Sequence, residues 1–356
     1  MRTTDFNYVL PESLIANRPL KERSASRLLV LHPNGEPEHR HFCDLPSYLE
    51  RGDILIINNT KVFPARLTGI REDGKTMDIL LVKEESPGAW QVLSRGNFSG
   101  RLTISRDFGV DLQNGTSARF DYSGSLTDLI WKYGDMPLPP YIRRSPDHSD
   151  RKAYQTVYAR NEGSIAAPTA GLHFTGAVLE AIASKGVTVR ELTLHVGTGT
   201  FKPVRTELVE DHCMEREYFE ISKALIAEIR ETRAAGHRVV AVGTTTTRCL
   251  EGYFSGRFTN GLRIEAMPLA PQESAGQDAP RKPSAHHVAG TTDIFIYPGY
   301  TFLAVNALIT NFHLPRSTPL ALVCALVGTE KILAAYQEAV LNGYRFLSFG
   351  DAMLIL

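Results

Sequence analysis

The chain has 356 residues, and its 39 basic residues balance 39 acidic residues, so the formal net charge at pH 7 is zero. This length is too great for one ordinary hydrophobic core, and we expect two domains. Any surface that binds nucleic acid must then be a local basic patch. The four cysteines stand far apart, which argues against a disulfide framework or a zinc knuckle.

The sequence carries no membrane signal. Residues 1–11 include Arg2 and Asp5 and lack an apolar centre, unlike a signal peptide. The longest apolar run, 320–327, is too short to span a bilayer. We therefore expect a cytoplasmic protein without membrane contact.

Residues 1–65 are predicted to begin the main domain, with an extended arm, a short helix near 44–49 and a strand. The run from Ile54 to Ile57 is continuously apolar, as in a strand buried on both faces. From residue 66 to about 124, glycine-containing turn signals separate short alternating segments without a helical period. This pattern predicts a small all-β barrel or sandwich, and we place an inserted domain at 66–145.

A proline-rich connector over 136–144 leads into a basic segment. Five basic residues and three tyrosines fall between Tyr141 and Arg160. Nucleic-acid grooves combine cations with stacking surfaces in this way, although a solvated charged face has a similar composition. The candidates for such a surface are Arg143, Arg144, Arg151, Lys152, Tyr154 and Arg160.

Residues 146–356 alternate between helix and strand patterns and are predicted to complete an α/β (mixed α+β) main domain. Helices are expected after Thr175, over 222–235, from the opening turn 243–248 onward, and over 320–327 and 329–342. Strands are expected over 187–196, 238–242, 292–297, 303–309 and 344–355, the last interrupted at 350–351. Residues 265–290 are poor in order-promoting residues and predict a long surface loop.

Four loops mix Gly or Pro with Thr, Asn, His or Arg at the edge of an element: 168–175, 195–202, 243–248 and 311–318. In an open α/β sheet such loops converge where ligands bind. His173, His195 and His313 would then meet there. Three histidines suggest a metal-dependent hydrolase as one alternative, but none has the local spacing of a metal-binding helix, and we expect no metal.

Two of these loops precede predicted helices. His173 stands just before a helix start, where the partial positive charge favours a neutral imidazole that can act as a base or bind by hydrogen bonds. A loop histidine satisfied by backbone groups is the alternative. The turn from Gly243 to Arg248 suits an anion, although a threonine cap with nothing bound looks the same.

Seven stretches together resemble one family. They are 136–142 (MPLPPYI), 154–159 (YQTVYA), 166–175 (AAPTAGLHFT), 194–201 (LHVGTGTF), 242–245 (VGTT, with Arg248), 308–315 (LITNFHLP) and 348–353 (SFGDAM). The chain resembles, from Asp5 to Ile355, the S-adenosylmethionine:tRNA ribosyltransferase-isomerases of queuosine biosynthesis. The resemblance implies a mixed α/β main domain with an inserted β-barrel, in agreement with the pattern above.

The resemblance also implies a reaction. The ribosyl part of S-adenosylmethionine is transferred to a 7-aminomethyl-7-deazaguanine in a tRNA anticodon and isomerised, which forms epoxyqueuosine and releases adenine and methionine. A base must remove a proton from the carbon beside the sulfonium, and His173 is the first candidate, followed by His195, His313 and Asp351. The candidates for binding S-adenosylmethionine are Thr169, Gly171, Gly197, Thr245, Arg248 and Asn311. The basic segment is the candidate tRNA surface, and we expect a monomer.

The sequence departs from the family pattern at several positions. Asn59 and Asn306 stand where acidic residues are expected, Cys249 and Leu347 replace commoner choices, and 265–290 matches poorly. The two asparagines leave open a catalytically impaired tRNA-binding paralogue as a second alternative.

Overall fold

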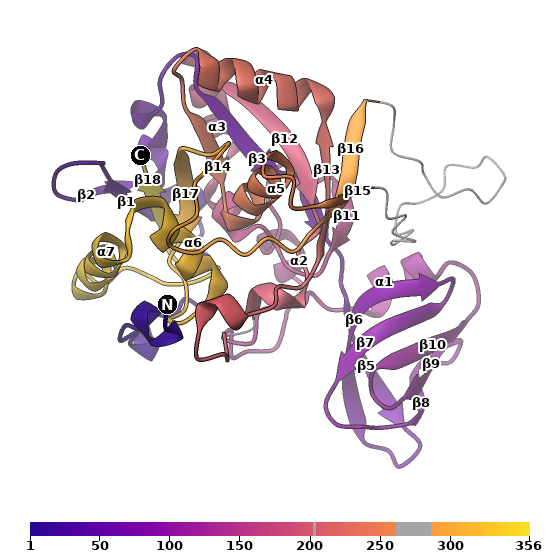
Figure 1. The fold of residues 1–356 in the computed structure, drawn as a ribbon. Helices are drawn as coiled ribbons and strands as arrows, with labels where there is room; N and C mark the ends of the chain where they lie inside the picture. The colour runs from indigo at the N-terminus through magenta and orange to yellow at the C-terminus, as the bar shows by residue number, and fades with distance from the viewer. Residues whose placement is uncertain (202–203, 261–285) are drawn as a thin grey trace.

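The structure is a computed structural model that describes residues 1–201, 204–260 and 286–356 (Figure 1). Most of the predicted loop over 265–290 lies outside the described residues. A ten-stranded sheet organises the main domain. In sheet order its strands are β15 (Thr259–Asn260), β16 (His287–Thr292), β13 (Glu217–Ser222), β12 (Thr188–Leu194), β3 (Ile54–Asn58), β14 (Val239–Val242), β17 (Ala307–Asn311), β18 (Ala352–Ile355), β1 (Arg27–Leu31) and β2 (Glu38–His41).

The four middle strands β12, β3, β14 and β17 run parallel, so their carboxyl ends share one edge of the sheet. Helices cover both faces (Figure 1). One face packs against α4 (Lys223–Ala234), α5 (Thr244–Phe254), α6 (Thr318–Val327) and α7 (Thr329–Leu341), and the other against α3 (Gly176–Ser184) and the 3-10 helix η4 (Phe42–Tyr48). In β3, Ile54 and Ile56 face the first layer while Leu55 and Ile57 face the second. The continuous apolar run follows from this double burial.

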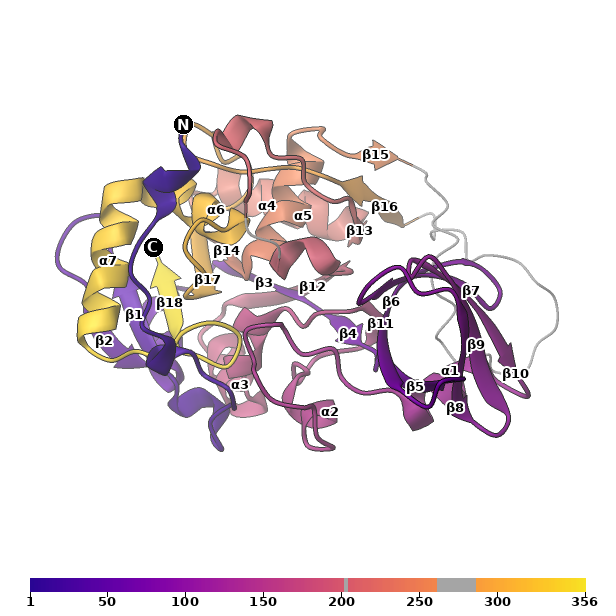
Figure 2. The same cartoon turned by 90° about the horizontal axis from the view of Figure 1, so that it is seen from below.

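The inserted segment forms a closed barrel, as predicted (Figure 2). Its strands are β5 (Arg66–Arg71), β6 (Thr76–Ser86), β7 (Ala89–Ser94), β8 (Gly100–Ser105), β9 (Phe108–Gln113) and β10 (Ser117–Tyr122). Trp90 and Phe108 fill its core. The absence of helix from the insert was a wrong expectation, because α1 (Leu126–Tyr133) follows the barrel, begins at the Ser125 cap and buries Ile130. The domain bounds 66–145 stay a prediction.

The chain enters and leaves the barrel beside a two-stranded parallel sheet. Its strands are β4 (Thr60–Val62) and β11 (Asn161–Ser164), which lie on either side of the insert in the sequence. The short helix α2 (Asp150–Ala153) lies in the returning segment. These elements place the barrel next to the edge of the main sheet where β3 and β12 end (Figure 2).

Several expectations for the main domain need correction. Strands β1 and β2 form within the arm that was expected to be extended. The strand expected over 292–297 ends at Thr292, because the residues after it have no sheet partner, although Ile294 and Ile296 alternate into the core. The C-terminal strand begins at Ala352, directly after the predicted interruption, but residues 344–349 do not form the strand expected before it, since Leu347 adopts a positive φ of 70°.

The helices expected in the main domain formed near their predicted bounds. The side chain of Thr175 caps α3 by accepting from the backbone N–H of Val178 at 3.3 Å. Ser222 and Ser317 cap α4 and α6 in the same way. Among the described residues, no single helix is long and apolar enough to cross a membrane; the bent pair α6 and α7, at 115°, meets that length and composition test only when the two are joined.

Candidate functional site

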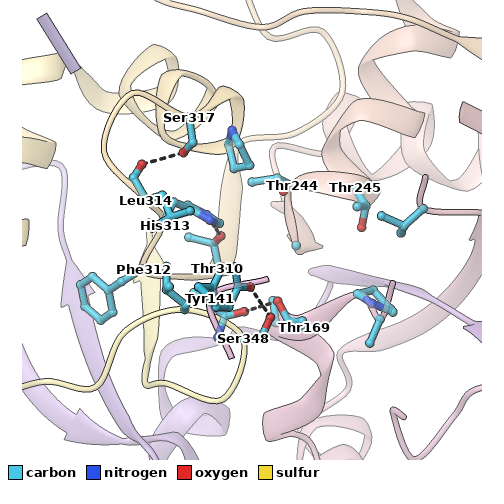
Figure 3. A pocket seen from close by; sticks show the side chains of 18 residues that line it. Tyr141, Thr169, Thr244, Thr245, Thr310, Phe312, His313, Leu314, Ser317 and Ser348 are labelled. Carbon is cyan, nitrogen blue, oxygen red and sulfur yellow. Dashed lines mark hydrogen bonds between the residues drawn. The ribbon is translucent and has the colours of Figure 1, made fainter. Parts of the chain in front are cut away.

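A pocket of about 650 Å³, counted out to its open mouth, lies at the carboxyl ends of β14 and β17 (Figure 3). Pockets at this position commonly bind small molecules in α/β proteins. Residues from all four predicted loops line it, together with Tyr141 and the segment 347–348. The predicted convergence of the loops is confirmed, although 195–202 contributes only Val196 to this lining.

Asn311, the last residue of β17, lies at the centre of a hydrogen-bond chain in the pocket wall. Its Oδ1 accepts from the hydroxyl of Thr169 at 2.9 Å, and its amide nitrogen donates to Nε2 of His173 at 3.0 Å. Since Nε2 accepts, the proton of His173 is on Nδ1, which donates to Oγ of Ser26 at 2.7 Å. The Ser26 hydroxyl donates in turn to the carbonyl of Arg23. This chain fixes the direction of every donor and acceptor in it.

His173 itself lies behind the pocket wall and does not line the pocket. Its ring stacks on Phe42 at 5.1 Å between centroids, and both ring nitrogens have protein partners. Burial, together with the nearby charges of Arg23 and Arg345, lowers the pKa of His173 to about 3. The imidazole is therefore neutral at pH 7, as expected, but it faces Asn311 and not the ligand space.

His313 is the candidate base that lines the pocket (Figure 3). Its Nε2 lies 2.7 Å from the hydroxyl of Thr310. The backbone of His313 is held by two tyrosines, because its N–H donates to the Tyr336 hydroxyl and its carbonyl accepts from Tyr8. Burial lowers the pKa of His313 to about 3, so its imidazole is also neutral at pH 7.

The other two candidate bases lie outside this pocket lining. Nδ1 of His195 lies 2.8 Å from the Thr60 hydroxyl at the start of β4, and burial lowers the pKa of His195 to about 4. The Asp351 carboxylate is buried, and it accepts from the backbone N–H groups of Arg27 and Arg345 at 3.0 and 2.8 Å. It also pairs with the Arg27 side chain at 3.3 Å. These contacts give Asp351 a role in holding the C-terminal turn.

Of the candidate ligand-binding residues, Thr169, Asn311 and Thr245 line the pocket. Gly171 does not; a Cβ there would lie 2.1 Å from the Tyr158 hydroxyl, so this glycine permits close packing. Gly197 is also outside the lining, and its N–H donates to the carboxylate of Glu217 at 3.2 Å.

Arg248 lines a second, smaller cavity. Thr244, Thr245 and Pro319 line both cavities, so the two adjoin at the first turn of α5. The turn before it requires Gly243, whose φ is 89°.

Sequence reasoning missed a pair in the pocket lining. The hydroxyl oxygens of Tyr141 and Ser348 lie 2.6 Å apart, and both residues line the pocket (Figure 3). Burial raises the pKa of Tyr141 to about 12. Each residue belongs to a stretch that carries the family resemblance, and that was the available signal. Their distance of 207 positions in the sequence concealed that they meet.

The predicted nucleic-acid residues fall into two groups. Arg143, Lys152 and Arg160 are exposed, although Arg143 pairs with Glu12 and Arg160 with Glu191.

The others have structural contacts. Arg144 binds both oxygens of Asp150 at 2.7 and 2.6 Å. Arg151 donates to the carbonyls of Trp131 and Gly134, at the end of α1. Tyr154 is fully buried, which removes it from any surface that stacks on bases.

Neither alternative function gains support from the geometry. Within the described ranges no three His, Cys, Asp or Glu side chains group as metal ligands, and the three candidate histidines have separate hydroxyl partners. Asn59 accepts from Thr193 at 2.8 Å, and Asn306 accepts from the N–H of Val239 at 2.6 Å. Neither asparagine lines the pocket.

Comparison with known proteins gives concordant matches. The family model described as "Queuosine biosynthesis protein" matches residues 3–355. Proteins named S-adenosylmethionine:tRNA ribosyltransferase-isomerase from Thermodesulfovibrio yellowstonii and Moorella thermoacetica are 51% and 47% identical, each over 100% of both chains. A crystal structure of S-adenosylmethionine tRNA ribosyltransferase from Thermotoga maritima is 34% identical, with a TM-score of 0.53 over 99% of this chain and 100% of that one.

A sheet covered on both faces, with a pocket at the carboxyl ends of its parallel strands and a barrel inserted beside it, defines an α/β protein whose pocket lies where such folds bind ligands. The matches then specify which kind. The chain belongs to the family of queuosine biosynthesis proteins.

Proposed function

We propose that the chain is an S-adenosylmethionine:tRNA ribosyltransferase-isomerase that acts in the cytoplasm as a monomer. It transfers and isomerises the ribosyl group of S-adenosylmethionine onto 7-aminomethyl-7-deazaguanine in a tRNA anticodon, forms epoxyqueuosine and releases adenine and methionine. The observation that carries the proposal is that one pocket collects residues from most of the motif stretches that mark the family.

Asn311 and Thr169 suit the sugar of S-adenosylmethionine. Their hydrogen-bond chain leaves lone pairs on Asn311 Oδ1 and Thr169 Oγ1, and such acceptors match ribose hydroxyl donors. His173 and Ser26 position this pair from behind the wall. His173 is thus a positioning residue in the proposal, in place of the base assigned to it from sequence.

His313 is the proposed base. It lines the pocket, its imidazole is neutral, and the Thr310 hydroxyl holds Nε2, so the ring is fixed in direction. The chemistry requires removal of a proton from the carbon that the adjacent sulfonium acidifies, and a positioned neutral imidazole can accept it. Among the four bases considered from sequence, His313 alone is in the pocket lining.

The exposed cations Arg143, Lys152 and Arg160 are the proposed tRNA contacts from the basic segment. All three belong to the segment that returns from the barrel to the main domain. Phosphates bound there would therefore lie beside the connection between the barrel and the main domain. Such contacts supply affinity and orientation, and the base is recognised in the pocket.

The activity is tested by incubating the protein with S-adenosylmethionine and tRNA that carries 7-aminomethyl-7-deazaguanine. Adenine and methionine should appear in equal amounts, with one epoxyqueuosine formed for each. The matched control is the same tRNA with guanine at that position, which lacks the aminomethyl nucleophile. Methyl transfer to tRNA without adenine release would contradict the proposal.

A further inference from the structure

The second cavity contains a buried arginine with an unused donor. The Arg248 side chain is 9% exposed; its Nε donates to the carbonyl of Ile294 at 3.1 Å and its Nη1 pairs with Glu217. Its Nη2 has no hydrogen-bond partner among the residues that the structure describes. A buried guanidinium nitrogen without a partner is costly, so a ligand that accepts from it would be strongly favoured.

A second unpartnered donor lies close by in the sequence. The hydroxyl of Thr245, buried in the first turn of α5, also has no partner within the described part of the chain. Arg248 follows it by three residues, which places both side chains on one face of the helix. The free N–H groups at the start of α5 add partial positive charge on the same side. Two donors and a helix start therefore favour an anionic group.

Apart from Thr244 and Thr318, the rest of the cavity wall is apolar. Met214, Ile294, Ile296 and Leu322 are among the residues that line it. A ligand for this space combines one anionic group with a short apolar chain. The cavity adjoins the main pocket through Thr244, Thr245 and Pro319, so one molecule can extend into both.

We infer that this second cavity binds the methionine half of S-adenosylmethionine, with its α-carboxylate on Nη2 of Arg248 and the hydroxyl of Thr245. This assignment rests on the proposed function. The apolar wall takes the methylene chain, and the sulfonium then lies where the two cavities adjoin. The nucleoside extends into the main pocket toward Asn311 and His313. Glu217 holds Arg248 in place and partly balances its charge.

The test compares two ligands that differ only in the carboxylate. Decarboxylated S-adenosylmethionine keeps the nucleoside, the sulfonium and the amine. The dissociation constants of both compounds are measured by calorimetry without tRNA. We expect the wild-type protein to bind S-adenosylmethionine about tenfold or more tightly than the decarboxylated compound, because charge-assisted hydrogen bonds are strong.

Removal of Arg248 should abolish this preference. Arg248→Met would remove the positive charge that balances the buried carboxylate of Glu217, so the variant to use is Arg248→Met with Glu217→Gln, and the control is Glu217→Gln alone. The double variant should bind both compounds alike, while the control keeps the preference. Thr245→Val is a milder second variant and should reduce the preference in part.

The outcomes separate the two proposals. Equal binding of both compounds by the wild type, or a preference that survives in the double variant, would overturn the carboxylate assignment and leave the proposed function intact. If Arg248 had only a structural role, the double variant would bind both compounds more weakly by the same factor, and this result would also overturn the assignment. If the wild type binds neither compound, even after the tRNA is added, the proposed function itself fails.

Discussion

The side-chain amide of Asn311 donates to Nε2 of His173 across 3.0 Å, and this bond determines what each residue can do. The same amide lies 3.5 Å from the carbonyl of Asp351, while Oδ1 accepts from Thr169. With Nδ1 directed at Ser26, no nitrogen of His173 is left for a ligand. The histidine acts on the pocket through the orientation of Asn311.

Substitution of His173 tests this relationship. His173→Ala should remove the better acceptor of the buried Asn311 amide, destabilise the protein by about 2–4 kcal/mol and raise KM for S-adenosylmethionine. His173→Gln can still accept from Asn311 and donate to Ser26, so it should recover most of the activity. Steady-state kinetics and urea unfolding measure both effects. A kcat lowered about 100-fold in His173→Gln, with KM unchanged, would instead make His173 the base.

The same residue should make stability depend on pH. The pKa of His173 is about 3 in the folded protein against an ordinary value of 6.5, so between these values the unfolded chain binds a proton that the folded chain does not. The contribution of His173 to the free energy of unfolding is therefore fully present above pH 6.5 and is lost progressively as the pH falls toward 3. Acidification from pH 7 to pH 5 should lower the free energy of unfolding by about 2 kcal/mol through this one group.

Urea unfolding at the two pH values measures the loss, with His173→Gln as the matched control. The variant lacks the titrating group and should lose less stability on acidification than the wild type. An identical loss in both proteins would mean that His173 titrates near its ordinary value.

Much of the fold could be predicted because local patterns and burial agree. Ile54–Ile57 predicted a doubly covered strand, and Thr175 and Ser222 predicted helix starts, since each depends only on neighbours in sequence. The strand expected near Ile294 failed for a reason that no local pattern shows. Alternating burial there arises from packing on the core without a ladder partner.

The site was predictable in its loops but not in its geometry. The motifs indicated which loops would converge, yet the choice between His173 and His313 depends on which side of Asn311 each ring occupies. Ring position is set by contacts with Ser26 and Thr310, and these are tertiary. Likewise, Tyr154 looks like a stacking surface until its full burial is known.

Asn311, which ends β17, and Asn306, which directly precedes this strand, provide a matched pair of substitutions. Asn311→Asp replaces the amide donor by an acceptor, so the bond to His173 survives only if the histidine moves its proton to Nε2 or takes up a second proton in a buried place. Binding of S-adenosylmethionine should weaken about tenfold or more. Asn306→Asp should change little, because Asn306 is exposed and only its oxygen is used, by the N–H of Val239. Equal effects of the two changes would contradict a special role for Asn311.

Substitutions of Arg151 and Lys152 should distinguish a residue that attaches the barrel to the main domain from one that binds tRNA. Arg151 donates to the carbonyls of Trp131 and Gly134 at 2.6 and 2.8 Å, so Arg151→Ala should speed proteolytic cleavage near 137–149 while the barrel strands stay intact. The exposed Lys152 makes no such contact, and Lys152→Ala should leave the digestion pattern unchanged.

For tRNA, Lys152→Ala should weaken binding and reduce the dependence of affinity on salt by about one charge. Early cleavage throughout 77–104 in the wild type would contradict the predicted domain at 66–145. Unchanged tRNA affinity and salt dependence in Lys152→Ala would remove this residue from the proposed surface.

His313 is the most direct test of the chemistry. His313→Gln keeps a polar group in the pocket but cannot accept the proton, so kcat should fall about 100-fold or more while S-adenosylmethionine still binds. Because the pKa of His313 is lowered to about 3, its imidazole stays neutral from about pH 5 to 8, and kcat/KM should show no acid limb near 6.5 from this group. Thr310→Val removes the hydroxyl beside Nε2 and should lower kcat less than His313→Gln, since the ring remains. Adenine release measured in quenched tRNA-modification reactions gives kcat, and calorimetry gives the affinity for S-adenosylmethionine. Near-normal adenine release by His313→Gln would end its assignment as the base and return attention to His195, which the Thr60 hydroxyl holds at 2.8 Å outside this pocket.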